Sequence, residues 1–170
     1  TFTYKPDPDF HGSDNFAYSA SDGTDSSEPA EVTITINPVN DPPTAKGDTY
    51  STDEDRILDI PLATGILTND TDTDGDPLIA LVTSEPAHGI LKAEADGAFV
   101  YTPEPDFNGE DRFTYKADDG DLDSEDVTVA ISVSAVNDPP VARDDTYTTD
   151  EDETLKIEPA GVLENDTDTE

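Results

Sequence analysis

The chain has 170 residues, with 42 Asp and Glu side chains against 8 Lys and Arg side chains, and its formal net charge at pH 7 is −34. A surface this acidic repels phosphate, which argues against binding to nucleic acids and to anionic membranes. No apolar run approaches the ~20 residues that span a bilayer, which argues against membrane insertion. Cys is absent, so disulfide bonds, thiolate metal sites and Cys nucleophiles are excluded.

Runs in which apolar and polar residues alternate predict β-strands in much of the chain. In chain order the seven central strands are predicted at 44–52, at Leu58 and Ile60, at 78–83, at 90–95, at Phe99 and Tyr101, at Phe113, Tyr115 and Ala117, and over Val127–Ser134. No helix is predicted. High charge and 32% hydrophobic content favour disorder, but regular aromatic and β-branched positions oppose it. The pattern predicts an all-β protein with an Ig-like antiparallel β-sandwich fold.

The sequence repeats itself after 97 residues, which is the separation of the Asn-Asp-Pro-Pro segments at 40–43 and 137–140. At this offset residues 1–23 align without a gap with residues 98–120. The repeat predicts tandem modules of about 97 residues. The predicted domains are 1–40, the C-terminal part of one module; 41–137, a complete module; and 138–170, the N-terminal part of the next.

The most specific chemical pattern is the acidic loop at 69–76. Its Asp residues stand at every second position, and calcium takes oxygen ligands from a short loop at such a spacing. An EF-hand is excluded, because Leu81 stands where its bidentate Glu would be. The alternative is a soluble Asx-rich turn. So many carboxylates repel one another without a cation, which favours calcium.

The loops of a seven-stranded sandwich alternate between its two ends, and this groups the other acidic residues. The turn at 53–55 and the loop at 105–111 are expected beside the linker at 137–138. The loops at 69–77 and 118–124 are expected beside the linker at 40–41. The predicted cofactor is Ca²⁺, and the candidate ligands are Asn40, Asp41, Asp53, Glu54, Asp55, Asn69, Asp70, Asp72, Asp74, Asp76, Asp106, Asp111, Asp118, Asp119, Asn137, Asp138, Asn165, Asp166 and Asp168.

The chain resembles the cadherin-like Ig repeats of giant secreted bacterial adhesins over essentially its whole length. The resemblance is carried by Val-Asn-Asp-Pro-Pro at 136–140, the loop at 69–78, residues 101–120 and the closing strand. It implies a secreted, cell-surface protein whose calcium-filled junctions stiffen successive modules into an adhesive stalk or spacer. The implied partners are calcium ions and neighbouring modules. The residues that match the family pattern best are Asp70, Asp72, Asn137 and Asp138, whereas Glu170 departs from it by standing in the place of Asp74.

Three other interpretations of the acidic loops compete with a calcium-dependent spacer. A carbohydrate-binding or accessory module of a secreted polysaccharide-active enzyme is the main alternative, but Trp is absent and no outward aromatic platform is predicted. Adaptation to high salt would spread acidic residues evenly instead of gathering them in loops. Catalysis is not expected, because His11 is replaced by Asn108 in the repeat and His88 has no nucleophile or repeated acid beside it.

The aromatic residues are assigned to packing. Phe10 and Phe107 are expected to plug the end of a sandwich, and Tyr4 and Tyr101 to direct their hydroxyls to neighbouring backbone groups. Because Met is absent, we expect the chain to be a piece of a longer protein. Its two incomplete modules carry complementary apolar faces, so we expect them to fray or to join head-to-tail with other copies.

Overall fold

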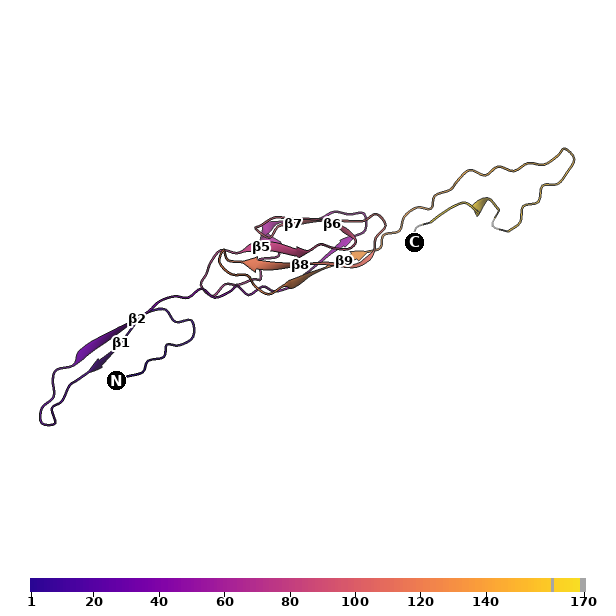
Figure 1. The fold of residues 1–170 in the computed structure, drawn as a ribbon. Coiled ribbons are helices and arrows are strands. Elements are labelled where there is room, and N and C mark those ends of the chain that lie inside the picture. The colour runs from indigo at the N-terminus through magenta and orange to yellow at the C-terminus, as the bar shows by residue number, and fades with distance from the viewer. Residues whose placement is uncertain (160, 169–170) are drawn as a thin grey trace.

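The computed structural model describes residues 1–159 and 161–168 (Figure 1). Among these residues the strands are β1 (Gly12–Tyr18), β2 (Ala30–Ile36), β3 (Asp48–Asp53), β4 (Leu58–Ile60), β5 (Ile79–Ser84), β6 (Gly89–Ala93), β7 (Phe99–Pro103), β8 (Gly109–Asp118) and β9 (Val127–Ser134). Two 3₁₀ turns, η1 (Leu62–Thr64) and η2 (Gly161–Leu163), are its helical elements. No helix in this part of the chain is long and apolar enough to cross a membrane.

Strands β3 to β9 form a β-sandwich, referred to below as the central sandwich. One sheet has the strand order β3-β9-β8-β5 and the other has the order β4-β7-β6. The inward positions of β7, β8 and β9 alternate with outward ones, as the period-2 pattern predicts. The core between the sheets is built from Ile66, Ala80, Phe99, Tyr101, Phe113, Tyr115, Val129, Ile131 and Val133.

The pairing of β3 corrects the prediction of a wholly antiparallel sandwich. β3 lies parallel to β9, with Tyr50 opposite Ile131. The chain reverses direction at each of the six connections between β3 and β9, so the first and seventh strands run the same way. The first strand also begins at Asp48 instead of residue 44. Thr44 pairs with Thr71 in the acidic loop, which holds the segment before β3 away from β9.

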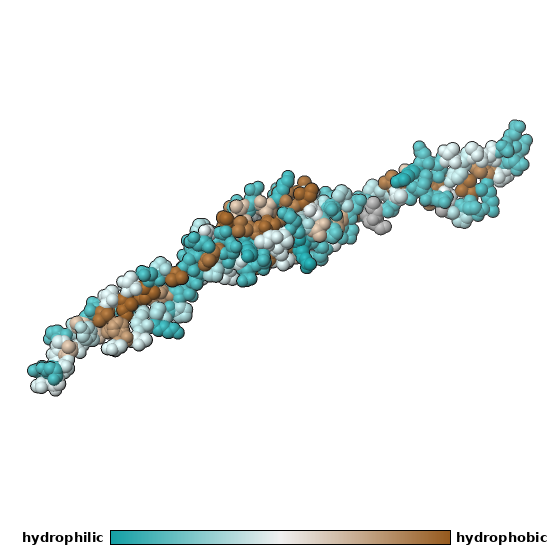
Figure 2. Space-filling model, in the orientation of Figure 1, coloured by the Kyte–Doolittle hydropathy of each residue, from teal (hydrophilic) through white to brown (hydrophobic). Residues whose placement is uncertain are grey.

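The remaining segments lie at opposite ends of an elongated molecule (Figure 1). At the N-terminal end β1 and β2 form a two-stranded antiparallel sheet. At the C-terminal end the described residues after Val141 form a Val141–Thr167 bridge and η2. At the 97-residue offset these ends correspond to β7–β9 and to β3–β4, and among the described residues each end has fewer strands than the matching part of the central sandwich. Exposed apolar residues accompany the unpaired strand edges, and Figure 2 shows apolar surface along the β1–β2 end.

Candidate metal centre

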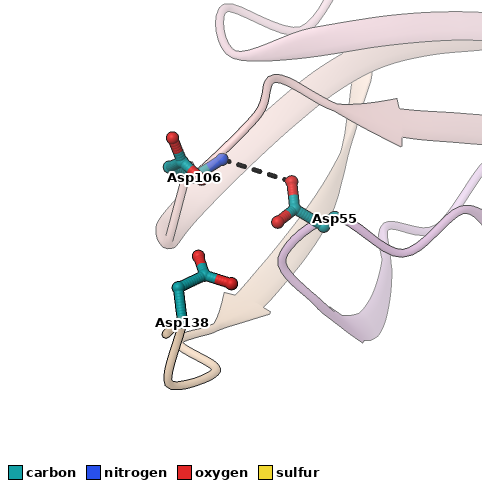
Figure 3. Close-up of side chains that lie close together, drawn as sticks. All are labelled: Asp55, Asp106 and Asp138. Carbon is teal, nitrogen blue, oxygen red and sulfur yellow. Dashed lines mark hydrogen bonds between the residues drawn. The ribbon is translucent and has the colours of Figure 1, made fainter. Parts of the chain in front are cut away.

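Three carboxylates converge at the end of the central sandwich that leads into the C-terminal segment. Asp55 lies in the turn after β3, Asp106 in the loop between β7 and β8, and Asp138 in the linker after β9 (Figure 3). One oxygen from each lies within 4.8 Å of the others. We call these three residues the carboxylate cluster. The structure therefore brings together one residue from each of the three segments that the alternation of loops groups at this end.

Tight turns place two members of the carboxylate cluster. Asp55 has φ 56° and Asp106 has φ 58°, in the left-handed region that Asp tolerates better than most residues. The backbone N–H of Asp106 donates to Asp55 Oδ1 at 3.3 Å, which joins the two turns. Their counterparts at the 97-residue offset, Asp152 and Asp9, have φ 67° and 56°. The same turn geometry thus recurs wherever the sequence repeats.

Glu54 holds the linker in place beside the carboxylate cluster. Its side chain is buried, with Oε1 accepting the N–H of Val136 at 2.5 Å and Oε2 accepting from Asn108 Nδ2 at 3.3 Å. Glu54 is one of the predicted metal ligands, but both of its carboxylate oxygens are hydrogen-bonded within the protein. Asn108 is not among the predicted ligands, and the repeat carries His11 at the equivalent position. Its location two residues after Asp106 is the one signal that points to it.

Electrostatic repulsion within the carboxylate cluster is substantial. Two unit charges about 4 Å apart repel by about 1 kcal/mol in water and about 4 kcal/mol near a protein surface. Asp55 and Asp106 are exposed and Asp138 is partly buried, so the true cost lies between these limits. Arg56 follows Asp55 in the chain, but its guanidinium lies 3.8 Å from Asp53, another predicted ligand. A divalent cation would replace mutual repulsion by attraction.

The dimensions of the carboxylate cluster fit calcium. Calcium takes 6–8 oxygen ligands at 2.3–2.6 Å, so two ligands of one ion lie at most about 5 Å apart. The three carboxylates are already within this span. Magnesium, with ligands at about 2.0–2.1 Å and strict octahedral geometry, needs a tighter set. The cluster could supply three hard oxygen ligands and leave further positions to backbone oxygens or water.

At the opposite end of the central sandwich, the incoming linker contacts two acidic loops. The Asn40 side chain donates to Asp119 Oδ2 at 3.0 Å, and the Asp41 N–H donates to Asp74 Oδ2 at 2.9 Å. Hydrogen bonds from the backbone of Leu122 and Asp121 and from Asn40 lower the pKa of Asp119. The neighbouring Asp118 accepts the N–H of Gly120. We call Asn40, Asp41, Asp74 and Asp119 the incoming junction.

The residues of the predicted calcium loop have different roles in the structure. Asp70 is committed to the fold, because Oδ1 accepts the Lys46 N–H at 2.8 Å and Oδ2 accepts the Tyr115 hydroxyl at 2.9 Å. Asp72 Oδ1 accepts three backbone N–H groups, from residues 74 to 76, and thereby shapes the loop. Asp72 Oδ2 and Asn69 Oδ1 are buried without a hydrogen-bond partner. Asp76 is exposed. The two unpaired oxygens, Asp72 Oδ2 and Asn69 Oδ1, are the part of the loop best suited to a cation.

Asp111 lies apart from both junctions. It is 4% exposed and accepts four hydrogen bonds. The donors are the backbone N–H groups of Ala87, His88 and Arg112 and the Tyr101 hydroxyl. The Tyr101 hydroxyl also lies 3.2 Å from the His88 carbonyl, the type of backbone partner predicted for it. The Tyr4 hydroxyl instead donates to the side chain of Asp14, so the prediction of a backbone partner is wrong for Tyr4. Asp111 therefore serves the fold.

The C-terminal segment partly reproduces the contacts of the acidic loop at 69–76. Asp166 accepts the Arg143 N–H at 2.9 Å, as Asp70 accepts that of Lys46. Asn165 Oδ1 is buried without a partner, as Asn69 Oδ1 is. In the linker the Asn137 side chain donates to the Asp138 carbonyl. The third candidate of this segment, Asp168, is exposed, and Glu170 lies outside the described residues.

The two loop phenylalanines differ in their surroundings. Phe107 is partly buried against the core of the central sandwich, and its ring stacks on His88 at 4.3 Å, as the prediction of an end plug requires. Phe10, its counterpart in the repeat, is 41% exposed, so that prediction is wrong for this residue. The reason is that Phe10 lies just before β1, and among the described residues the β1–β2 sheet has no opposing sheet to cover this side chain.

The chain is similar to parts of several solved structures. Human mucin-like protocadherin EC1-2 matches with a TM-score of 0.53 and 17% identity, over 80% of this chain and 74% of that one. An endo-fucoidan hydrolase of glycoside hydrolase family 107 matches with a TM-score of 0.39 and 20% identity, over 78% of this chain and 21% of that one. A nucleoside hydrolase-related hypothetical protein from Saccharophagus degradans matches with a TM-score of 0.39 and 12% identity, over 57% and 26% of the two chains. This chain thus spans about a fifth to a quarter of these hydrolase-type proteins.

Comparison at the sequence level identifies the family. None of the curated proteins matches this chain. The bacterial Ig domain family matches residues 1–35 and 40–132, which is most of the chain. The protocadherin likeness agrees with this match at the level of the fold. The chain belongs to the bacterial Ig domain family, and its central sandwich is an all-β, Ig-like and cadherin-like fold.

Proposed function

We propose that this chain is a calcium-binding spacer of an extracellular bacterial protein, in which tandem Ig-like modules act in cell-surface adhesion. The observation that carries the proposal is the carboxylate cluster, because it joins two loops of the central sandwich to the linker that follows it. A cation bound there fixes the linker relative to the sandwich. The 97-residue repeat and the Asn-Asp-Pro-Pro linkers at both ends support an array of such modules.

The mechanism is mechanical and requires no catalysis. Asp138 stands directly before the Pro139-Pro140 pair, which favours an extended backbone. Glu54 holds the linker on the sandwich two residues before Asp138, by accepting the Val136 N–H. Calcium held by Asp55, Asp106 and Asp138 would cancel their repulsion and restrict the remaining freedom of the linker. The incoming junction offers the same combination of linker and loop residues at the other end.

The carbohydrate-binding alternative receives no support from the central sandwich. A sugar site usually presents an aromatic side chain on the surface, and every Phe and Tyr between residues 44 and 134 is buried or partly buried. The acidic residues that converge at the two ends also differ from the even distribution expected for adaptation to salt alone.

Calcium titration of single variants tests the proposal. We expect calcium to raise the melting temperature of the chain, since a ligand at a hundredfold excess over Kd stabilises the native state by about 2.7 kcal/mol. Asp138→Asn and Asp106→Asn should weaken calcium binding in calorimetric titrations at least about tenfold. Asp59→Asn, an exposed substitution of the same charge change on β4, is the matched control.

A comparison of salts distinguishes specific calcium binding from general screening of the negative charges. The comparison is made with sodium chloride and magnesium chloride at the same ionic strength as the calcium chloride. A melting temperature that rises equally in all three salts, or a calcium affinity that Asp138→Asn leaves intact, would contradict the proposed function.

A further inference from the structure

The two linkers leave the central sandwich at opposite ends, so tension along the chain crosses the sandwich between them (Figure 1). The incoming linker leads into β3, and the outgoing linker follows β9. β3 and β9 are therefore the strands that receive tension first. Every other strand of the central sandwich lies between them in the chain. The way in which β3 is joined to β9 decides how the sandwich responds to tension.

A parallel ladder joins β3 directly to β9. Six residue pairs form it, from Asp48 opposite Val129 to Asp53 opposite Ser134. Because the strands are parallel, tension pulls β3 by its first residue and β9 by its last, towards opposite ends of the ladder. The strands must then slide past each other, and the hydrogen bonds between them share the load. In an antiparallel pair the start of one strand lies beside the end of the other, and the same pull would open one hydrogen bond at a time.

Packing against the core opposes sliding of β3 along β9. The Tyr50 ring lies edge-to-face on Phe99, with 5.0 Å between the ring centroids, and the Tyr50 hydroxyl donates to the Thr64 carbonyl at 2.9 Å. On β9 every second residue from Val129 to Val133 is buried. A slip of one residue would turn inward side chains to the outer face of the sheet. The ladder therefore keeps its register until it breaks as a unit.

Glu54 extends the ladder at the end from which the outgoing linker leaves. Its backbone N–H donates to the Ser134 carbonyl at 2.9 Å, and its Oε1 accepts the Val136 N–H. Val136 is the residue directly before the linker residue Asn137. Tension that arrives through this linker therefore reaches the Glu54–Val136 hydrogen bond first. This hydrogen bond opposes the peeling of β9 away from β3.

We propose that the β3–β9 ladder, completed by Glu54, is a load-bearing element that lets the sandwich withstand tension along an array of modules. The inference rests on the proposed function in one respect, since an array held at both ends transmits tension through its linkers. It does not depend on calcium, because the ladder and Glu54 join the strands without a cation. Forced unfolding is governed by the unfolding rate along the loaded path, so the resistance should depend on the direction of pull.

Single-molecule force spectroscopy of the full chain in two pulling directions tests the proposal. Because the natural chain has no Cys, handles can be attached to Cys pairs at exposed positions. Val39→Cys with Ala142→Cys loads the ladder along its length, and Val39→Cys with Glu125→Cys pulls the starts of β3 and β9 apart. In chelator we expect the first pair of handles to require at least about twofold higher force, because the six residue pairs break together instead of in turn. Segments outside the handles carry no load.

Variants of Glu54 test its part in the ladder. Glu54→Ala should lower the rupture force for the first pair of handles and leave that for the second unchanged, because pulling the strand starts apart reaches Glu54 last. Glu54→Gln keeps an oxygen for the Val136 N–H and should restore most of the lost force. Asp59→Ala, which removes an exposed carboxylate from β4, is the matched control and should change neither force.

Equal rupture forces in the two directions would overturn the proposal, and so would a Glu54→Ala variant that lowers both forces alike or neither. The comparison of directions needs no substitution at a buried position, so it decides the proposal even if Glu54→Ala does not fold. Because the measurements are made in chelator, they are independent of the calcium titrations that test the proposed function. A chain that binds no calcium can still resist force in this direction, and a calcium-binding chain can lack this resistance.

Discussion

At the scale of single residues, the partners of each carboxylate oxygen determine what the residue does. Both oxygens of Asp70 accept hydrogen bonds from the surrounding fold, and so do both oxygens of Glu54. Burial opposes the ionisation of Asp111, but its hydrogen bonds outweigh this effect and hold its pKa below the usual range. Asp55, Asp106 and Asp138 come from three segments and converge, with one oxygen of each within 4.8 Å of the others. Residues of the same type therefore divide into those that build the fold and those suited to a cation.

Asp48, at the start of β3, gives a pH-dependent prediction. Burial, together with the charge of Asp70, raises its pKa to about 6. Because the folded-state pKa lies above the unfolded value, the stabilising effect of its proton is full below the unfolded pKa and is lost as the pH rises through about 6. Because an Asn side chain does not titrate, Asp48→Asn removes this loss of stability at higher pH. The variant should gain about 1 kcal/mol of unfolding free energy relative to the natural chain between about pH 4 and about pH 7.5, allowing for partial solvent screening.

Urea unfolding in chelator at several pH values measures this effect. The control is Asp59→Asn, which removes a carboxylate from an exposed position of β4. A difference between Asp48→Asn and the natural chain that stays constant across the pH range would contradict the prediction.

At the scale of elements, β6 and β7 pack so closely that the side chain at one position must be hydrogen. A Cβ added at Gly89 would lie 2.4 Å from the Tyr101 ring and 2.7 Å from the Thr102 carbonyl oxygen. Tyr101 cannot move away easily, because it is fully buried and its hydroxyl bonds Asp111 at 2.8 Å. The first residue of β6 can therefore carry a side chain only if β6 moves away from β7.

Gly89→Ala should lower the unfolding free energy by about 1–3 kcal/mol, the usual cost of overpacking. Ile90→Ala is the control on the next residue, since Ile90 is 66% exposed and its truncation should cost less than about 0.5 kcal/mol. Chemical denaturation of both variants measures the effect. Equal stability of Gly89→Ala and the natural chain would show that β6 can shift away from Tyr101.

At the scale of the whole molecule, the linkers control the shape. Short Pro-containing linkers lie on either side of the central sandwich, and each contacts acidic loops at one end of it. Without a cation, repulsion among the carboxylates favours arrangements in which the linker bends away from the sandwich. With calcium bound, the linker and the loops would be held together.

Small-angle X-ray scattering should therefore show a larger maximum dimension and a narrower size distribution when calcium is added. The measurement is best made on dilute protein. Asp138→Asn should weaken the response to calcium. Profiles that are identical in calcium and in chelator would mean that the Pro-Pro pairs alone set the geometry.

Several features of this protein are present in the sequence by itself. Alternation along Val127–Ser134 and at Phe113, Tyr115 and Ala117 identifies the strands and their buried faces, because a strand presents successive residues to opposite sides. The predicted bounds are less accurate where local contacts intervene, as at β3, whose preceding residues bind the acidic loop. The 97-residue repeat also identifies equivalent residues, and the shared turn conformation of Asp9 and Asp106 agrees with it.

Only the tertiary structure decides which acidic residues come together. Composition and spacing nominate Asp111 and Asp138 equally, and Asn108 not at all. The difference arises from packing across the sandwich: backbone N–H groups from another segment surround Asp111, whereas Asp138 reaches two loops that lie far from it in sequence. Local sequence determines strands and turns through neighbouring residues, but the partners of a side-chain oxygen come from segments that only the folded sheets bring into contact.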